Sequence, residues 1–176
     1  MSEARPARCT CCGVASRPAG GALAIHGNGL RARQVRGPRV VGVDASQVVI
    51  YARRYECQEC GAVMTVVPCE IIPRMLFAAP AIALALALYG LEGQSARAVR
   101  AAVSPLRKVG TPEGGWKTLG RWIAQAPSLW ACIRPAPAGA ATRMRAERAA
   151  TTLAAHAGGV HQSVLHAAFA GAVHAH

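Results

Sequence analysis

The chain has 176 residues, with 20 Lys and Arg against 8 Asp and Glu, and its formal net charge is +12. This length allows about one or two domains and excludes a large multidomain enzyme. Hydrophobic residues make up 52% of the chain but aromatic residues only 5%. This composition predicts small modules in series rather than one deep core.

Positive charge is spread along the whole chain, and all but two of the basic residues are arginine. Such a chain is attracted to polyanions, and nucleic acid is the polyanion that a small basic protein most often meets. Guanidinium groups also bind phosphate and guanine edges through two parallel hydrogen bonds. The alternative is a solvated surface that merely reflects an arginine-rich composition.

The acidic residues are too few and too scattered for a two-metal catalytic centre. Asp44 is the only aspartate, and the closest pair of glutamates, Glu56 and Glu59, flanks a cysteine. The sequence also lacks a Gly-rich phosphate-binding loop. We therefore expect a protein that is not an enzyme. The first residues form no apolar stretch of the secretory type, which predicts a cytoplasmic location.

Two Cys-x2-Cys-Gly segments, which begin at Cys9 and Cys57, are the strongest signal in the sequence. Two residues between ligands let one tight turn direct both thiolates at a single ion, and the glycine allows the positive φ that such a turn needs. Together the segments predict a closed structural zinc site. An iron site of the rubredoxin type is the alternative. The ligands are Cys9, Cys12, Cys57 and Cys60.

The other cysteines and the histidines give weaker signals. Cys11 lies between two ligands and is interpreted as a bystander, and Cys69 and Cys132 as lone structural thiols. His26 follows an apolar run and is interpreted as a surface residue, with a role as a substitute ligand left open. We expect the histidines of the C-terminal segment to be solvated; they are His161, His166, His174 and His176.

The segment between the two cysteine pairs is longer than the usual spacer of about 15–20 residues, so it must itself be folded. Its composition predicts strands at 22–26, 30–36, 47–53 and 62–67, with a turn at Gly27-Asn28-Gly29. Arginines alternate with apolar residues in the second of these runs. The pattern indicates a β-ribbon with a basic face, and the cations Arg53 and Arg54 are candidates for DNA contact.

A proline-rich stretch near residue 70 marks a domain boundary and leads to a helix whose first turn contains Pro80. The run from Ala81 to Tyr89 is apolar on nearly all sides and stops at Gly90, which predicts a buried helix. A membrane span over residues 71–91 is the alternative, although its uninterrupted part is shorter than the roughly 20 residues required. Ser95 is the expected N-cap of a second helix over 96–103.

A third helix is predicted to begin near Trp116. Its apolar stripe includes Trp122, and both tryptophans are interpreted as core residues. Three short helices with a polar outer face on the last are typical of a helix-turn-helix, although a solvated helical bundle remains the alternative. The outward residues Lys117, Thr118 and Arg121 are the predicted base contacts. The predicted phosphate contacts are Arg97, Arg100, Arg107 and Lys108.

The last part of the chain starts with a Pro- and Ala-rich linker at Arg134. Residues 140–157 are alanine-rich and favour a helix. A final segment over 160–173 places Val160, Val164, Ala167 and Ala168 on one face, which could pair with a second copy. The fold class expected is α+β, with a zinc ribbon over 1–70, a helix-turn-helix domain over 71–132 and an Ala-rich helical tail over 133–176.

Several motifs in this order resemble a known group of proteins. They are Arg53-Arg54-Tyr55-x-Cys57-x-x-Cys60-Gly61, Thr65-Val66-Val67-Pro68, Ala85-Leu86-x-Leu88-Tyr89-Gly90, Ser95-x-x-x-Val99-Arg100 and Thr118-Leu119-x-Arg121-Trp122. Over about residues 9–125 the chain resembles the zinc-ribbon plus helix-turn-helix proteins of bacterial mobile elements, including the N-terminal parts of insertion-sequence transposases.

This resemblance implies binding of double-stranded DNA within a transposition or integration system, with a transposase or recombinase as partner. The full transposases carry a downstream catalytic domain with an acidic triad, which this chain lacks, so the resemblance does not transfer catalysis. The alternative is an adaptor whose zinc ribbon binds a transposase or polymerase subunit.

Overall fold

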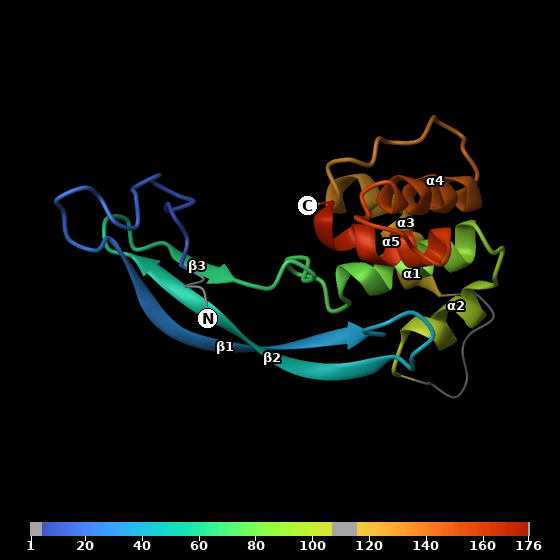
Figure 1. Cartoon of the computed structure of the whole chain (residues 1–176), viewed down its shortest axis with the longest axis horizontal. Helices are drawn as coiled ribbons and strands as arrows, with labels where there is room; N and C mark the ends of the chain where they lie inside the picture. The colour runs from blue at the N-terminus through green and yellow to red at the C-terminus, as the bar shows by residue number, and fades with distance from the viewer. Residues whose placement is uncertain (1–4, 107–115, 176) are drawn as a thin grey trace. The chain divides into compact units, whose positions relative to one another are not determined.

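The computed structural model describes residues 5–106 and 116–175 of the chain. Within these ranges a three-stranded antiparallel sheet precedes five helices, so the predicted α+β class is confirmed (Figure 1). The strands are β1 (Ile25–Gly37), β2 (Ser46–Cys57) and β3 (Val63–Val66). The helices are α1 (Ala79–Gly90), α2 (Ala96–Val103), α3 (Lys117–Leu129), α4 (Thr142–Ala154) and α5 (Val164–His174).

The chain divides into two compact units. The first unit holds residues 1–34 and 49–68, and the second holds residues 35–48 and 69–176. The first unit therefore contains both cysteine pairs, and the second contains the helices. The segment expected as a separate tail over 133–176 supplies α4 and α5 to the second unit.

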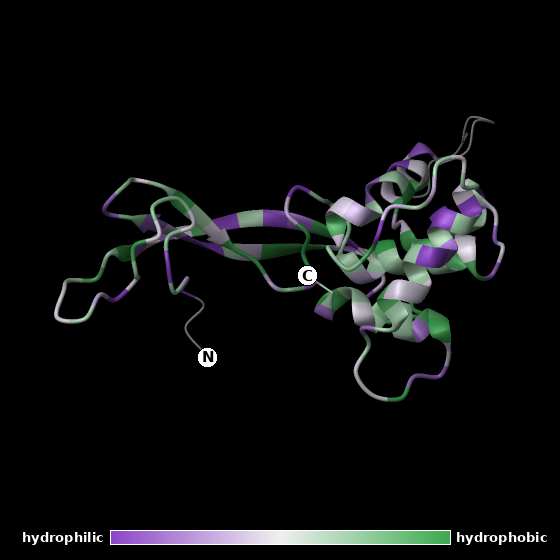
Figure 2. Cartoon of the chain, turned by 90° about the horizontal axis from the view of Figure 1, so that it is seen from above, coloured by the Kyte–Doolittle hydropathy of each residue, from purple (hydrophilic) through white to green (hydrophobic). Residues whose placement is uncertain are grey.

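The strands lie in the order β1-β2-β3. β2 pairs antiparallel with β3, with Arg53 opposite Val66 and Tyr55 opposite Met64. Burial alternates along β2 as predicted, because Ala52 is buried between two exposed neighbours. Figure 2 shows the resulting hydrophilic and hydrophobic bands along the strands. The strands predicted over 47–53 and 62–67 are thereby confirmed.

The turn predicted at Gly27-Asn28-Gly29 is wrong, because β1 runs without a break from Ile25 to Gly37. An Asn-Gly turn requires the two flanking segments to pair with each other, whereas both segments here belong to one strand that pairs with β2. Asn28 instead donates a hydrogen bond to the Glu56 carboxylate at 3.0 Å. Gly29 has a φ of 74°, as in a strand with a local bulge.

The helix α1 is the centre of the second unit. Every residue of α1 except Tyr89 is buried, and α1 packs against each of the other four described helices (Figure 1). It has proline in its first turn and ends at Gly90, as predicted. A Cβ atom at Gly90 would collide with the backbone of Glu147 in α4. Gly90 therefore allows α1 and α4 to approach closely.

The helices α2 and α3 each pack on α1 through an apolar stripe. The Ser95 side chain caps α2 as predicted and accepts a hydrogen bond from the Ala98 N–H at 3.2 Å. Trp122 is buried in α3, and its ring meets the rings of Phe77 and Trp116 edge to face at centroid distances of 4.9 and 5.0 Å. Trp122 is thus a core residue, as predicted, and Trp116 is partly buried against the same core.

The helices α4 and α5 complete this core. The indole N–H of Trp130 donates to the Ala172 carbonyl in α5 at 3.2 Å, in a buried position. Gly171 packs so closely on α4 that a Cβ atom there would collide with the Leu153 carbonyl. Ala168, which was expected on a face for pairing with a second copy, is buried, while Val164 is exposed. The expected pairing face is therefore partly used within the chain itself.

None of the helices in the described parts of the chain has the length and apolarity needed to cross a membrane. The apolar run that raised this alternative is α1, which is only 12 residues long and is covered by other helices.

Candidate metal centre and basic helix face

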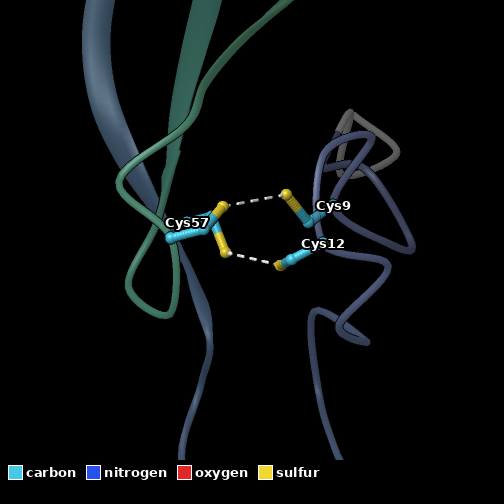
Figure 3. Close-up of side chains that lie close together, drawn as sticks. Cys9, Cys12 and Cys57 are labelled. Atoms are coloured by element: carbon cyan, nitrogen blue, oxygen red, sulfur yellow. Dashed lines mark hydrogen bonds between the residues drawn. The ribbon is translucent and has the colours of Figure 1, made fainter.

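Four cysteine sulfur atoms lie together in the first unit. The Sγ atoms of Cys9, Cys12, Cys57 and Cys60 all lie within 4.8 Å of one another. The Cys9 and Cys60 sulfurs are 3.7 Å apart, and so are the Cys12 and Cys57 sulfurs. Figure 3 shows Cys9 and Cys12 on one side of the cluster, facing Cys57 on the other. The two segments predicted to share a metal are thus brought together.

The sulfur separations fit a metal ion. Sulfur atoms about 2.3 Å from a central metal form a tetrahedron whose edges are about 3.8 Å, close to the two distances of 3.7 Å. A disulfide would require a separation of about 2.05 Å, and all four cysteines are free. Four thiolates fill a tetrahedral coordination shell and leave no position for water or substrate. The donor set is therefore that of a structural site.

The two knuckles have the same backbone geometry. In each, the N–H of the first cysteine donates to the carbonyl five residues further on, at 2.9 Å for Cys9 and 3.0 Å for Cys57. The N–H of the glycine donates back to the carbonyl of that cysteine, at 3.0 Å for Gly13 and 2.9 Å for Gly61. These glycines have φ values of 76° and 69°, the conformation that the sequence predicted.

The thiols of this cluster influence one another's ionisation. Hydrogen bonds from the backbone of Cys12 and Cys11 lower the pKa of Cys9 to about 6. The backbone of Ala62 favours the Cys60 thiolate, but desolvation and the neighbouring thiols outweigh it and raise the pKa of Cys60 to about 12. The Cys9 thiol therefore ionises readily. Ionisation of the Cys60 thiol beside it requires a nearby cation to offset the negative charge. A divalent metal ion would supply that positive charge.

The cluster forms one end of the core of the first unit. Cys9 and Cys57 are buried beside the apolar side chains of Ile25, Tyr55 and Met64. Cys12 and Cys60 are exposed. A metal ion held by all four thiolates would therefore tie the core to both knuckles.

Neither substitute ligand lies in the cluster. Cys11 is exposed, and only its backbone N–H approaches the site, at 3.4 Å from the Cys9 sulfur. His26 is also exposed, and its Nε2 lies 2.7 Å from the Leu23 carbonyl oxygen. These positions agree with the bystander and surface roles expected from the sequence.

The predicted base contacts lie on α3. Lys117 and Arg121 are exposed and four residues apart, which places them on the same side of the helix, and Thr118 beside them is half-buried. The other side of α3 is anchored in the core by Leu119 and Trp122. The helix thus presents two cationic side chains on its outer face.

The predicted phosphate contacts are more dispersed. Arg97 is exposed and Arg100 half-buried on α2. The link from α2 to α3 spans residues 104–116, longer than the three- or four-residue turn of a DNA-binding helix-turn-helix. Arg107 and Lys108 in this link lie outside the described residues.

Arg53 and Arg54 are adjacent on β2 and therefore point to opposite faces of the sheet. Arg53 is exposed, and Arg54 is half-buried. Only one of the two can thus belong to any single basic face of the ribbon.

A scan against protein-family models, a search of curated proteins and a search of solved structures each found no match. The functional interpretation therefore rests on the residues of this chain.

Sequence reasoning missed two surface features. Arg134, Arg145 and Arg148 line a pocket on the second unit, although the sequence placed them in a linker and a tail. The spacing of the last two, three residues apart on an alanine-rich helix, was the available signal. In the first unit Leu30 and Tyr51 are 61% and 69% exposed, respectively, and with Val49 they leave apolar side chains on the ribbon surface.

Proposed function

We propose that this chain binds double-stranded DNA through α3 and that a structural zinc ion holds its ribbon. The observation that carries the proposal is the outer face of α3, where Lys117 and Arg121 are exposed on a helix anchored by its opposite side. The net charge of +12 provides the general attraction to a polyanion. The chain recognises DNA rather than cutting it, because its few acidic residues offer no catalytic cluster.

Zinc is the metal that suits this role. A closed site of four thiolates at the edge of a small core has a structural task, and zinc performs it without redox chemistry. A rubredoxin-type iron site uses the same donors, so metal content distinguishes them. We expect one zinc per chain and no visible absorption in protein purified without added metal. Stoichiometric iron with a coloured protein would contradict the zinc assignment.

The dimensions of α3 fit the major groove. A helix of 13 residues is about 20 Å long, and the groove is about 12 Å wide and accepts a helix. In this arrangement Lys117, Thr118 and Arg121 contact base edges. Arg97 and Arg100 on α2 contact phosphates, as do Arg107, Lys108 and the exposed Arg53 of the ribbon by their charge.

The resemblance to proteins of mobile elements suggests the biological setting. We place the chain as an accessory or regulatory factor that recognises DNA, such as element ends, in a transposition or integration system in the cytoplasm. A separate transposase or recombinase would supply the catalysis. The exposed Val164 on α5 leaves a small apolar area for contact with a second copy.

The test is binding to labelled duplexes across a salt series. We compare the wild type with Lys117→Ala and Arg121→Ala, and use Arg39→Ala, which removes an exposed arginine outside the proposed interface, as a charge-matched control. Each α3 variant is expected to lose about 1–3 kcal/mol of affinity at a preferred sequence. Equal losses in all three variants, or none in the α3 variants, would contradict recognition by α3.

An adaptor role is the second candidate, and the exposed apolar side chains of the ribbon favour it. Leu30, Val49 and Tyr51 are each more than half exposed. If the ribbon binds a transposase or polymerase subunit, Tyr51→Ser should abolish co-elution of the purified pair in high salt after nuclease treatment. Unchanged co-elution would exclude this surface as the partner site.

A further inference from the structure

A pocket of about 270 Å³ opens on the second unit between the end of α3, the loop that follows it and the middle of α4. We call it the arginine pocket, after Arg134 in the loop and Arg145 and Arg148 on α4, which line it. None of the described residues that line it is acidic. The pocket therefore concentrates positive charge in one concave place.

The three arginines have no visible structural task. Among residues 5–106 and 116–175, no hydrogen bond or ion pair engages their guanidinium groups. By contrast, Arg143 on the same helix donates to the carbonyls of Tyr89 and Gln94 and thereby joins α4 to the end of α1. Like charges on one helix face repel each other, so a ligand of opposite charge would relieve this repulsion.

The pocket has a rigid apolar floor. Ile123 and Ala126 of α3 and Ala149 of α4 line it and are almost completely buried in the core. In the loop, the N–H of Ile133 donates to the Trp130 carbonyl at 3.0 Å. A low-dielectric floor strengthens the attraction between the guanidinium groups and an anion.

The chemistry of the arginines selects an oxyanion. A guanidinium group presents paired N–H donors that match two oxygens of a phosphate, and three such groups around one pocket can surround a tetrahedral anion. A phosphate group is therefore the ligand that the pocket fits best.

The outer face of α3 connects this pocket with the proposed DNA contacts. Ala124 and Ser128 line the pocket and are exposed, and they follow Arg121 by three and seven residues, on the same face of the helix. From Arg121 to Ser128 the helix rises by about 10 Å, which equals the axial rise of about three base pairs of DNA. A strand in contact with Arg121 could therefore reach the pocket.

We propose that the arginine pocket binds a backbone phosphate of the DNA that α3 contacts. This inference rests on the proposed function and adds to it the residues that hold the flanking backbone. A phosphate contact positions the helix but carries no sequence information. Losing it should weaken binding to all duplexes alike.

The first experiment compares full-length, metal-loaded Arg145→Ala/Arg148→Ala with Arg39→Ala and with Lys117→Ala. Alanine favours the helical conformation, so the double variant should keep α4 folded. The slope of log K against log[salt] is expected to decrease by about 0.9 for each phosphate contact that is lost. We therefore expect a decrease of about one in the double variant, with an unchanged preference among duplex sequences, and a wild-type slope in Arg39→Ala.

The second experiment uses inorganic phosphate as the probe and follows the side-chain Nε–H signals of the arginines by NMR. Saturable shifts of the Arg134, Arg145 and Arg148 signals that added duplex reverses would support the proposal. Phosphate binding with an unchanged salt slope in the double variant would show a site for a free oxyanion and overturn it.

The two levels of failure can be told apart. If Lys117→Ala weakens DNA binding but the double variant has the wild-type slope, the arginine pocket is not a DNA contact and the proposed function stands. If the wild type binds no duplex, the proposed function and this inference both fail.

Discussion

Removal of the proposed zinc ion is expected to unfold the first unit and leave the second folded. Besides the two cysteines, the core of the first unit consists of Ile25, Tyr55 and Met64. Burying a large apolar side chain contributes about 1.5–3 kcal/mol, so these three together supply about 5–9 kcal/mol. A structural zinc ion supplies roughly 10–16 kcal/mol in small sites. A zinc ion bound by these cysteines would thus contribute more to folding than the apolar core that surrounds it.

The positions of the aromatic residues allow the two units to be followed separately. Trp116, Trp122 and Trp130 all belong to the second unit, so tryptophan fluorescence reports on the helices alone. Amide hydrogen exchange in β2 and β3 over residues 49–66 reports on the first unit. A chelator such as EDTA should therefore abolish exchange protection in these strands and leave the tryptophan emission unchanged.

Two variants sharpen this test. Cys60→Ala removes a ligand and should lose both the metal and the protection of the strands, whereas Cys11→Ala removes the exposed thiol beside the site and should lose neither. Strands that remain protected in metal-free protein or in Cys60→Ala would refute the reasoning. A large change in tryptophan emission on chelation would equally show that the helices depend on the metal.

Three further predictions follow from the packing and the thiols. Gly90→Ala should destabilise the second unit by about 1–3 kcal/mol in a denaturant titration, because its Cβ would collide with α4. Gly120→Ala, with open space around it, should instead stabilise α3 by about 0.5–1 kcal/mol. A similar effect of both variants would contradict the close approach at Gly90. Arg143→Lys should lower the free energy of unfolding by about 1 kcal/mol in the same assay, because an ammonium group cannot reproduce both carbonyl contacts and the stacking over the Tyr89 ring at 4.4 Å. An unchanged unfolding midpoint would show that these contacts are dispensable. The number of protons released per metal ion bound should rise by about one as the pH falls through about 6, because the pKa of Cys9 is lowered to about 6 and its thiol is protonated in the metal-free protein only below that pH. Calorimetry in buffers of different ionisation enthalpy measures this number. A constant proton release between pH 5 and 7 would contradict the low pKa.

Features that depend on a few adjacent residues could be predicted from the sequence. The two knuckles are specified by two cysteines and a glycine each, and the structure reproduces the positive φ at Gly13 and Gly61. The limits of α1 and the cap of α2 follow from Pro80, Gly90 and Ser95 in the same way. In these cases the residue that the local turn or helix end requires is also compatible with the packing in the folded chain, so the local signal was sufficient.

Two features that depend on contacts between distant segments could not be predicted. The Asn-Gly pair in β1 carries a turn signal, but the conformation is decided by the hydrogen bonds that β1 makes with β2. The arginine pocket combines the end of α3, a proline-containing loop and α4, so no single window of sequence contains it. Arg134 has the sequence surroundings of a linker and becomes part of a site only through the fold.

The composition of α1 nevertheless indicated that this helix must be covered on all sides. A helix that is apolar on all sides needs partners in every direction, and α2 and α3 each offer only a narrow apolar stripe. The remaining sides must be covered by another part of the chain, a second copy or a membrane. Residues 133–176 supply the cover, because Gly90 and Gly171 remove the side chains that would keep α4 away from α1 and α5 away from α4. The segment expected as a separate Ala-rich helical tail therefore packs into the core of the second unit, with glycine at the two closest approaches.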